Sequence, residues 1–263
     1  MPWADFEWGS SNADDDVSEA FLEGFVASMP SRYSVLFEAR AMRRHAAVSY
    51  RRGGRKAHVE LWRALPDGSA ALCVVAEDRP GLLSAIAAAL VLHRLDVITA
   101  LVFSRPLPGG SAEAVDLVWV RRVSTSETAA IRADEAESIG EVLGAIMSGS
   151  VSVEQIASQA FPSSAARDRS VVVRFEAIDE EGLAALVVEA PDRPGILLTI
   201  ALALFQQGAQ IVRSLVRTSD GRTFNRFEVA EFSGASLTQQ RREQIRGAVL
   251  AVLSLPEALS AAT

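Results

Sequence analysis

The sequence predicts an α+β protein built from two similar α/β sandwiches with antiparallel sheets, preceded by a short helical segment. The tetrapeptide Asp-Arg-Pro-Gly occupies residues 78–81 and recurs unchanged at residues 192–195. The register between the two copies holds without a gap from Val59 and Val173 to Arg105 and Ser219. A repeat of that length indicates a duplicated structural unit. Each tetrapeptide separates an apolar run typical of a strand from an apolar run with helical spacing.

Composition and charge narrow the class of protein. The chain has 263 residues, a formal net charge of −7 and one cysteine. This charge argues against a general nucleic-acid binder, which needs a basic surface. Cys73 lies in an apolar run and excludes a disulfide framework. The apolar stretch 84–92 is too short to span a bilayer, and residues 1–16 are acidic, unlike a secretion signal. We therefore expect a cytoplasmic protein without membrane contact.

Residues 1–57 are predicted to hold a disordered start followed by helices. Residues 1–16 are polar and acidic, whereas apolar residues recur at helical spacing over 17–29 and again, after Pro30, over 33–48. Seven arginine and lysine residues lie between Arg40 and Lys56. We favour a solvated helix face and linker for this basic cluster over an anion or nucleic-acid site.

The two repeats are predicted to share one order of elements, strand–strand–helix–strand–strand–helix. In the first repeat, residues 58–150, we expect strands at 58–64, 71–76, 96–103 and 114–123, a helix after Gly81, and a closing helix to about Ile146 behind a Ser124/Glu127 capping box. Residues 151–166 form a linker with a short helix at 153–159. In the second repeat, residues 167–263, the strands are expected at 171–177, 183–190, 210–218 and 224–232, with helices after Gly195 and after a Ser236/Gln239 capping box. This order fits a ferredoxin-like sandwich whose edge strand has moved to the beginning.

The repeated turn resembles the ACT family of small-molecule-binding domains. The likeness rests on a strand that ends in Asp-Arg-Pro-Gly, the amphipathic helix that follows, and a strand that opens with Leu95-Asp96-Val97, and it covers most of residues 58–255. The chain is most similar to the tandem ACT regions that end bacterial uridylyltransferase/uridylyl-removing enzymes. Both turns read Asp-Arg-Pro-Gly there, and the residues 29–33 and 66–68 are also similar. The resemblance implies an amino-acid sensor, with glutamine as the ligand.

The catalytic parts of such enzymes have no counterpart in the sequence. Gly9-Ser10 is followed by an acidic stretch, not by a strand with alternating carboxylates. The histidines, His45, His58 and His93, are scattered, and none has a neighbour at metal-ligand spacing. Motifs for a nucleophilic serine or a phosphate-binding loop are also missing. We therefore predict no catalytic residues, no metal and no cofactor, and expect a non-enzymatic regulatory protein.

The chemistry of the repeated turn suits a zwitterion. Pro80 fits a first helical turn, and Gly81 lets a ligand approach the backbone. Free N–H groups at a helix start attract a carboxylate, and the aspartate side chain can accept hydrogen bonds from an ammonium group. The alternative is structural, with the aspartate capping the helix and Pro-Gly shaping a tight turn. The repeat and the resemblance favour a ligand site in at least one copy.

The resemblance assigns ligand contacts to the turn and to the start of the strand after the helix, at an interface between paired domains. The residues that it implicates are Asp78, Arg79, Gly81, Leu82 and Asp96 in the first repeat, and Asp192, Arg193, Gly195, Ile196 and Gln210 in the second. Some serine-binding relatives carry asparagine at the aspartate positions. Gly208 keeps the glycine that usually precedes this strand, whereas the first repeat has His93-Arg94. The second repeat is therefore the more regular one.

Several features leave alternatives open. Four arginines, Arg213, Arg217, Arg222 and Arg226, lie on the last strand pair, and we favour a charged, solvated edge strand there over an anion site.

The second functional hypothesis is a transcriptional regulator similar to the tandem-ACT repressor of glycine cleavage, which would contact DNA through residues 40–56. A third is a degenerate copy that only scaffolds an oligomer. We expect the repeats to pack against each other, a homodimer, and a protein partner for the sensor.

Overall fold

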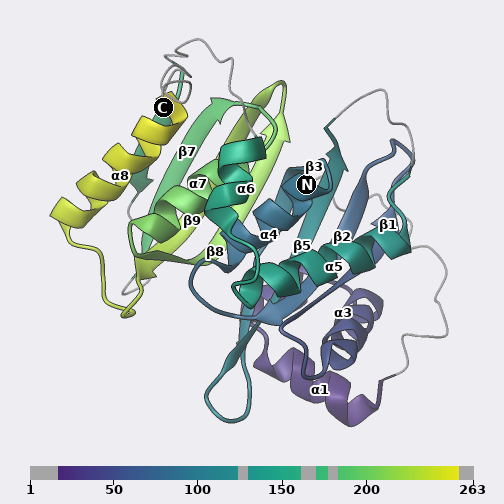
Figure 1. The fold of residues 1–263 in the computed structure, drawn as a ribbon. Helices are drawn as coiled ribbons and strands as arrows, with labels where there is room; N and C mark the ends of the chain where they lie inside the picture. Colours follow the sequence, from purple (N-terminus) through teal and green to yellow (C-terminus); the bar gives the residue numbers. More distant parts are fainter. Residues whose placement is uncertain (1–16, 124–129, 161–169, 177–182, 255–263) are drawn as a thin grey trace.

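A computed structural model describes residues 17–123, 130–160, 170–176 and 183–254, which form a mixed α+β structure (Figure 1). Three helices come first: α1 (Glu19–Ser28), α2 (Ser31–Leu36) and α3 (Ala39–Arg52). The first half then contains β1 (Ala57–Ala64), β2 (Ala70–Glu77), α4 (Leu82–Leu92), β3 (Leu95–Leu101), β4 (Ser104–Pro106), β5 (Ala112–Arg122) and α5 (Ala133–Met147). After α6 (Val153–Ala160), the second half contains β6 (Val172–Glu176), β7 (Ala184–Pro191), α7 (Ile196–Gln206), β8 (Ala209–Ser219), β9 (Arg222–Glu231) and α8 (Gln239–Ser254).

The nine strands found among the described residues belong to one antiparallel sheet. The strand order is β1-β2-β5-β3-β8-β9-β7-β6, with β4 paired to β5. The halves therefore meet at the centre, where Thr99 pairs with Arg217 and Leu101 pairs with Leu215. The first strand of each predicted hairpin, β1 or β6, lies at an outer edge beside its partner, as the repeated element order predicts. The predicted packing of the two repeats against each other is thus confirmed as a shared sheet.

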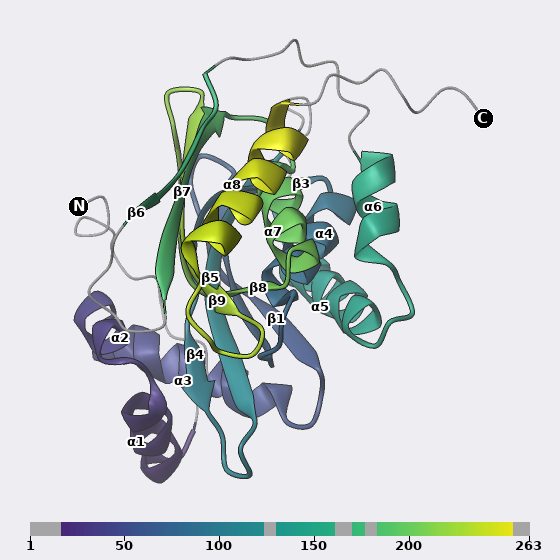
Figure 2. The same cartoon turned by 90° about the vertical axis from the view of Figure 1, so that its left-hand side faces the viewer.

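The helices of the repeats cover one face of this sheet. The apolar face of α4 buries Leu82, Ile86 and Leu90, and α7 buries the corresponding residues. These side chains join one continuous core that includes residues from both halves. Figure 2 shows α4, α5, α7 and α8 on this side of the sheet. Because burial of apolar side chains stabilises folding, this shared core joins the two halves energetically as well as topologically.

The N-terminal helices form a second core on the opposite face of the first half. Tyr33 and Phe25 are almost fully buried there, and Phe37 and Phe103 pack against them. The Tyr33 hydroxyl lies 2.8 Å from Nδ1 of His45, which is also buried. Burial lowers the pKa of His45 to about 3, so this histidine is neutral and has a structural role.

The basic cluster 40–56 matches the prediction of a solvated face only in part, because Arg40, Arg55 and Lys56 are exposed whereas Arg51 and Arg52 pair with the sheet. Arg51 donates to both carboxylate oxygens of Glu60, at 2.6 and 2.7 Å. Arg52 Nε lies 2.7 Å from Glu113, which is 2% exposed. Local periodicity could not predict these ion pairs, because the carboxylates lie on strands and not on the helix itself, Glu60 on β1 and Glu113 on β5. They hold α3 on the sheet.

Several element boundaries also differ. The predicted strand 96–103 ends earlier, because β3 stops at Leu101, and a separate short strand, β4, follows it and pairs with β5. The short helix of the predicted linker is present as α6. The Ser124/Glu127 capping box lies outside the described residues, and α5 begins later, at Ala133. No helix in the described part of the chain is long and apolar enough to cross a membrane.

Candidate functional site

Each Asp-Arg-Pro-Gly turn leads from a strand into a helix through a glycine. Gly81 and Gly195 have φ values of +84° and +72°, and α4 and α7 begin at the next residue. A left-handed φ is easy for glycine and strained for other residues, so the geometry explains the glycine. Pro80 therefore precedes the helix instead of lying in its first turn, which corrects the sequence prediction. Neither helix has a side-chain cap, so the structural alternative of a capping aspartate is also wrong.

The second turn is completed by side chains from the first half. The Gly195 N–H donates to Oδ1 of Asp96 at 3.3 Å. Arg121 on β5 donates to Oδ2 of Asp96 at 3.1 Å and to Oδ2 of Asp192 at 2.5 Å. One guanidinium group thus bridges a carboxylate of each half, and the other oxygen of Asp192 is left over.

That remaining oxygen is buried without a partner. Asp192 Oδ1 has no hydrogen-bond partner in the described structure, and the side chain is 12% exposed. A buried acceptor that lacks a hydrogen bond costs about 1–3 kcal/mol relative to a satisfied one. The arrangement therefore offers an unused acceptor in the same turn as the Gly195 N–H, which donates to Asp96.

The charges at this cross-half site are closely coupled. Burial raises the pKa of Asp96 above its ordinary value, and the nearby Asp192 carboxylate raises it further. Burial opposes the charged form of Arg121, but its hydrogen bonds and attraction to Asp192 and Asp96 raise its pKa overall. The guanidinium group is thus firmly charged and offsets the repulsion between the two carboxylates.

The first turn is instead covered by an aromatic ring. A Cβ atom added to Gly81 would lie 2.8 Å from the Phe205 ring of α7. The cavity beside this turn has a volume of about 20 Å³, which is room for one water molecule and not for an amino acid. Asp78 accepts a hydrogen bond from Ser104. The first turn is therefore closed in this structure.

In the structure, the predicted residue at the start of each strand lies beside the turn of the other repeat. Asp96, predicted with the first turn, bonds to the second. Gln210, predicted with the second turn, lines the first cavity together with Asp78, Arg79, Gly81 and Leu82. Ile196 is buried in the core, and the Arg193 side chain makes no hydrogen bond or ion pair with the described residues. The exchange arises because β3 and β8 run antiparallel at the seam, which brings each strand start to the opposite turn.

Two residues near these turns were not predicted. The sequence pattern predicts only a strand position for Arg121, and no local pattern indicates that it reaches the second half. Asp116 lies in the small cavity at 1% exposure and accepts a hydrogen bond from the Phe103 N–H at 3.3 Å. Burial and then the charge of Asp78 raise its pKa well above the ordinary value. A single acidic residue inside the apolar run 114–118 was the available signal for Asp116.

Comparison with known proteins gives weak but consistent similarity. No protein-family model matches the chain. The chain is similar to bifunctional uridylyltransferase/uridylyl-removing enzymes of Phenylobacterium zucineum (26% identity over 248 residues, 93% of this chain and 26% of the relative) and Nitrobacter hamburgensis (24% over 233 residues, 86% and 24%). The enzyme of Rhodopseudomonas palustris is 25% identical over 240 residues, 86% of this chain and 24% of the relative.

The matching region is a limited part of those relatives. The chain spans about a quarter of the length of the curated relatives that it matches. A match to the crystal structure of an unknown protein from Galdieria sulphuraria covers 74% of this chain and 92% of that protein's chain. Its TM-score of 0.23 and identity of 18% are too low to indicate a shared fold. The resemblance to uridylyltransferase/uridylyl-removing enzymes thus rests on sequence.

Proposed function

We propose that this chain is a non-catalytic regulatory protein with two ferredoxin-like ACT domains, which senses an amino acid between its halves. The observation that carries the proposal is the buried, unpartnered Oδ1 of Asp192 beside the Gly195 N–H. The duplicated order of strands and helices and the similarity to a quarter of the uridylyltransferase/uridylyl-removing enzymes support the ACT assignment. By that similarity, glutamine is the first ligand to test.

The ligand's two charged groups match groups already present at the second turn. Its ammonium group would donate to Asp192 Oδ1, and its carboxylate would accept from the Gly195 N–H and Arg121. In this structure, the carboxylate of Asp96 occupies the position beside the Gly195 N–H. Ligand binding would therefore displace Asp96. The Arg121 side chain is 42% exposed, so it can turn to admit the ligand.

Displacement of Asp96 also gives a route for signalling. Asp96 lies at the start of β3, the strand that joins the second half through β8. A ligand that replaces the link between Asp96 and Gly195 changes how the halves are held together. A protein partner that contacts both halves would sense that change through differential affinity for the two states.

Thermal unfolding in the presence of each of the twenty amino acids tests the proposal. A ligand at about 100 times its dissociation constant should stabilise the folded chain by about 2.7 kcal/mol if it binds only that state. We expect a clear increase in Tm with one small group of amino acids, glutamine first. The absence of a shift with every amino acid at millimolar concentration would contradict the sensor function.

Variants at the two turns locate the site. Asp192→Asn keeps the shape but loses the charge that holds the ammonium group, and Gly195→Val fills the backbone approach, so both should abolish the shift. The matched control is Asp78→Asn at the closed first turn, which should retain it. A response that survives Asp192→Asn but disappears in Asp78→Asn would place the ligand at the wrong turn for this proposal.

The alternative function, a DNA-binding regulator that uses residues 40–56, draws less support from the geometry. Arg51 and Arg52 are engaged by Glu60 and Glu113, so binding DNA phosphates would break existing ion pairs. A gel shift that persists at moderate salt and depends on sequence would favour the regulator.

A further inference from the structure

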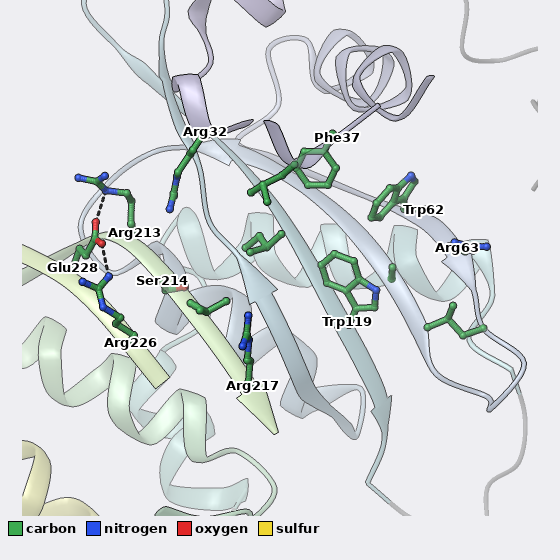
Figure 3. Close-up of a pocket in the computed structure, with 15 residues that line it drawn as sticks. Arg32, Phe37, Trp62, Arg63, Trp119, Arg213, Ser214, Arg217, Arg226 and Glu228 are labelled. Carbon is green, nitrogen blue, oxygen red and sulfur yellow. Dashed lines mark hydrogen bonds and ion pairs between the residues drawn. The ribbon is translucent and has the colours of Figure 1, made fainter. Parts of the chain in front are cut away.

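A large cavity lies on the other face of the sheet, away from both turns. Its volume is about 430 Å³, within the range of small-molecule sites. Helix α2 and Phe37, which follows it, bound the cavity on one side, and β8 and β9 bound it on the other (Figure 3). Strands β1, β2, β3 and β5 form its floor. The cavity thus spans the seam between the halves.

One side of the cavity is aromatic and apolar. Trp62 on β1 and Trp119 on β5 pack edge to face, with ring centroids 5.7 Å apart. Phe37 packs against Trp62 at 6.1 Å, and Leu101 and Leu215 lie at the seam. Figure 3 shows the two indole rings near each other on β1 and β5, the two strands that flank β2. Such a surface suits a flat apolar group, because aromatic rings pack well edge to face or stacked.

The other side of the cavity is strongly basic. The lining there includes one carboxylate, Glu228, and four arginines, Arg32, Arg213, Arg217 and Arg226, whereas Arg63 lies at the aromatic end near Trp62 (Figure 3). Glu228 lies 2.5 Å from both Arg213 and Arg226 and cannot offset the remaining charge. Arg217 is exposed at the cavity and has no ion-pair partner among the described residues. The basic side therefore has unused capacity for an anion.

Arg32 shows the effect of this excess charge. Its Nη2 donates to the Val102 carbonyl at 2.7 Å, and its guanidinium group lies over the Phe103 ring. Its Nε is buried without a hydrogen-bond partner. Burial lowers the pKa of Arg32, and repulsion from Arg213 lowers it further. A bound anion would relieve that repulsion and supply an acceptor.

The repeat shows that this basic surface is specific to the second half. Phe103 of the first half corresponds to Arg217 in the ungapped register. Leu117 corresponds to Arg226, because Leu117 pairs with Leu101 and Arg226 pairs with Leu215, the repeat of Leu101. Phe103 and Leu117 are buried beneath the N-terminal helices. The arginines also correct the predicted edge strand, because β8 lies between β3 and β9.

We propose that this cavity binds a small organic anion with a flat, apolar body and a carboxylate or phosphate group. The ring would pack on Trp62 and Trp119, and the anionic group would bind Arg32 and the arginines of β8 and β9. The site is separate from the turn at residues 192–195 and does not depend on the function proposed there.

Calorimetric titration with two probes tests this proposal. We use AMP as the phosphate probe and 2-naphthoate as the carboxylate probe, with adenosine and 2-naphthylmethanol as their uncharged counterparts. Inorganic phosphate serves as an anion without a ring. At least one charged probe should bind saturably, and at least about tenfold more tightly than its uncharged counterpart and than inorganic phosphate, since charge-assisted hydrogen bonds contribute that much.

A matched pair of arginine variants separates site binding from general charge attraction. Arg217→Gln should weaken binding about fivefold or more without disturbing the fold, because this side chain is exposed. The control is Arg222→Gln, whose side chain instead bonds to Ser170, and it should bind like the unmodified chain. Equal binding of charged and uncharged probes, equal losses in both variants, or no saturable binding at millimolar concentration would each overturn the proposal. The amino-acid response at Asp192 should be unchanged in Arg217→Gln.

Discussion

Single residues show how the two halves have diverged at equivalent places. Asp116 pairs with Val74 across β2 and β5, and Asn225 pairs with Val188 across β7 and β9. Since Val188 is the repeat of Val74, the two buried polar residues are equivalents. Asn225 is neutral at every pH, whereas Asp116 must be protonated to remain uncharged in its apolar surroundings.

The raised pKa of Asp116 predicts a specific dependence of stability on pH. The stability that protonated Asp116 contributes to the folded protein is fully present below about pH 4, the ordinary pKa of aspartate in an unfolded chain. It is lost as pH rises toward the raised pKa of Asp116 in the folded protein. Within that window the loss is about 1.4 kcal/mol per pH unit. Asp116→Asn should remove this slope, so the variant should be the more stable protein at pH 8 while differing little at pH 4.

Urea unfolding at pH 4, 6 and 8 measures this slope. Asp220→Asn, at an exposed turn, is the control and should follow the unmodified chain at each pH. If Asp116→Asn kept the full pH dependence, Asp116 would not be the group responsible.

At the residue scale, the two repeats share backbone geometry more closely than contacts. Their register aligns Arg94 with Gly208, and both residues have positive φ, +54° and +70°. The turn glycines were predictable for the same reason, since their conformation follows from a local motif. The contact between Asp96 and Gly195 was not predictable, because it joins residues from different halves whose relation depends on the whole sheet.

At the scale of elements, a buried charge network holds α3 against the sheet. Glu113 on β5 accepts hydrogen bonds from Ser49 at 2.7 Å, Arg52 at 2.7 Å and Arg105 at 2.8 Å. Arg105 is 8% exposed, so two cations share one buried carboxylate. Removal of one partner from such a network is costly, because it leaves charge buried without compensation.

Glu113→Ala should therefore destabilise the protein by about 3 kcal/mol or more. Glu60→Ala, which breaks the more exposed pair with Arg51, should cost about 1 kcal/mol or less. The free energy of unfolding from urea titration measures both. Similar losses in the two variants would show that burial does not set the cost.

The elements themselves were largely predictable, but their neighbours were not. Apolar periodicity located the helices after both turns and most strands. The order of strands in a sheet is not encoded in local pattern, so the arginine-bearing strand was wrongly predicted to be an edge. The basic side of the large cavity was missed for the same reason.

At the scale of the molecule, the continuous sheet predicts that both halves unfold together. All four tryptophans, at positions 3, 8, 62 and 119, precede the second half. Tryptophan fluorescence therefore reports on the first half, whereas far-UV circular dichroism reports on both. Because the halves share strand pairing and a core, the two signals should give one coincident transition.

A fragment of residues 167–263 extends this test. Without β3, the edge of β8 would be exposed, and an unpaired strand edge pairs readily with another copy. We expect this fragment to form dimers or larger species in sedimentation experiments. Separate fluorescence and dichroism transitions in the full chain, together with a monomeric fragment, would show that the halves are independent.

Covalent linkage of the halves has a consequence for how the two turns can change over time. In a dimer of identical single domains, a residue such as Phe205 would be present twice and would close both turns at once. In this chain, Phe205 closes the first turn, and Asp96 and Arg121 line the second. Because both repeats lie in one chain, the residues around the two turns can differ, and a substitution that closes one turn leaves the other unchanged.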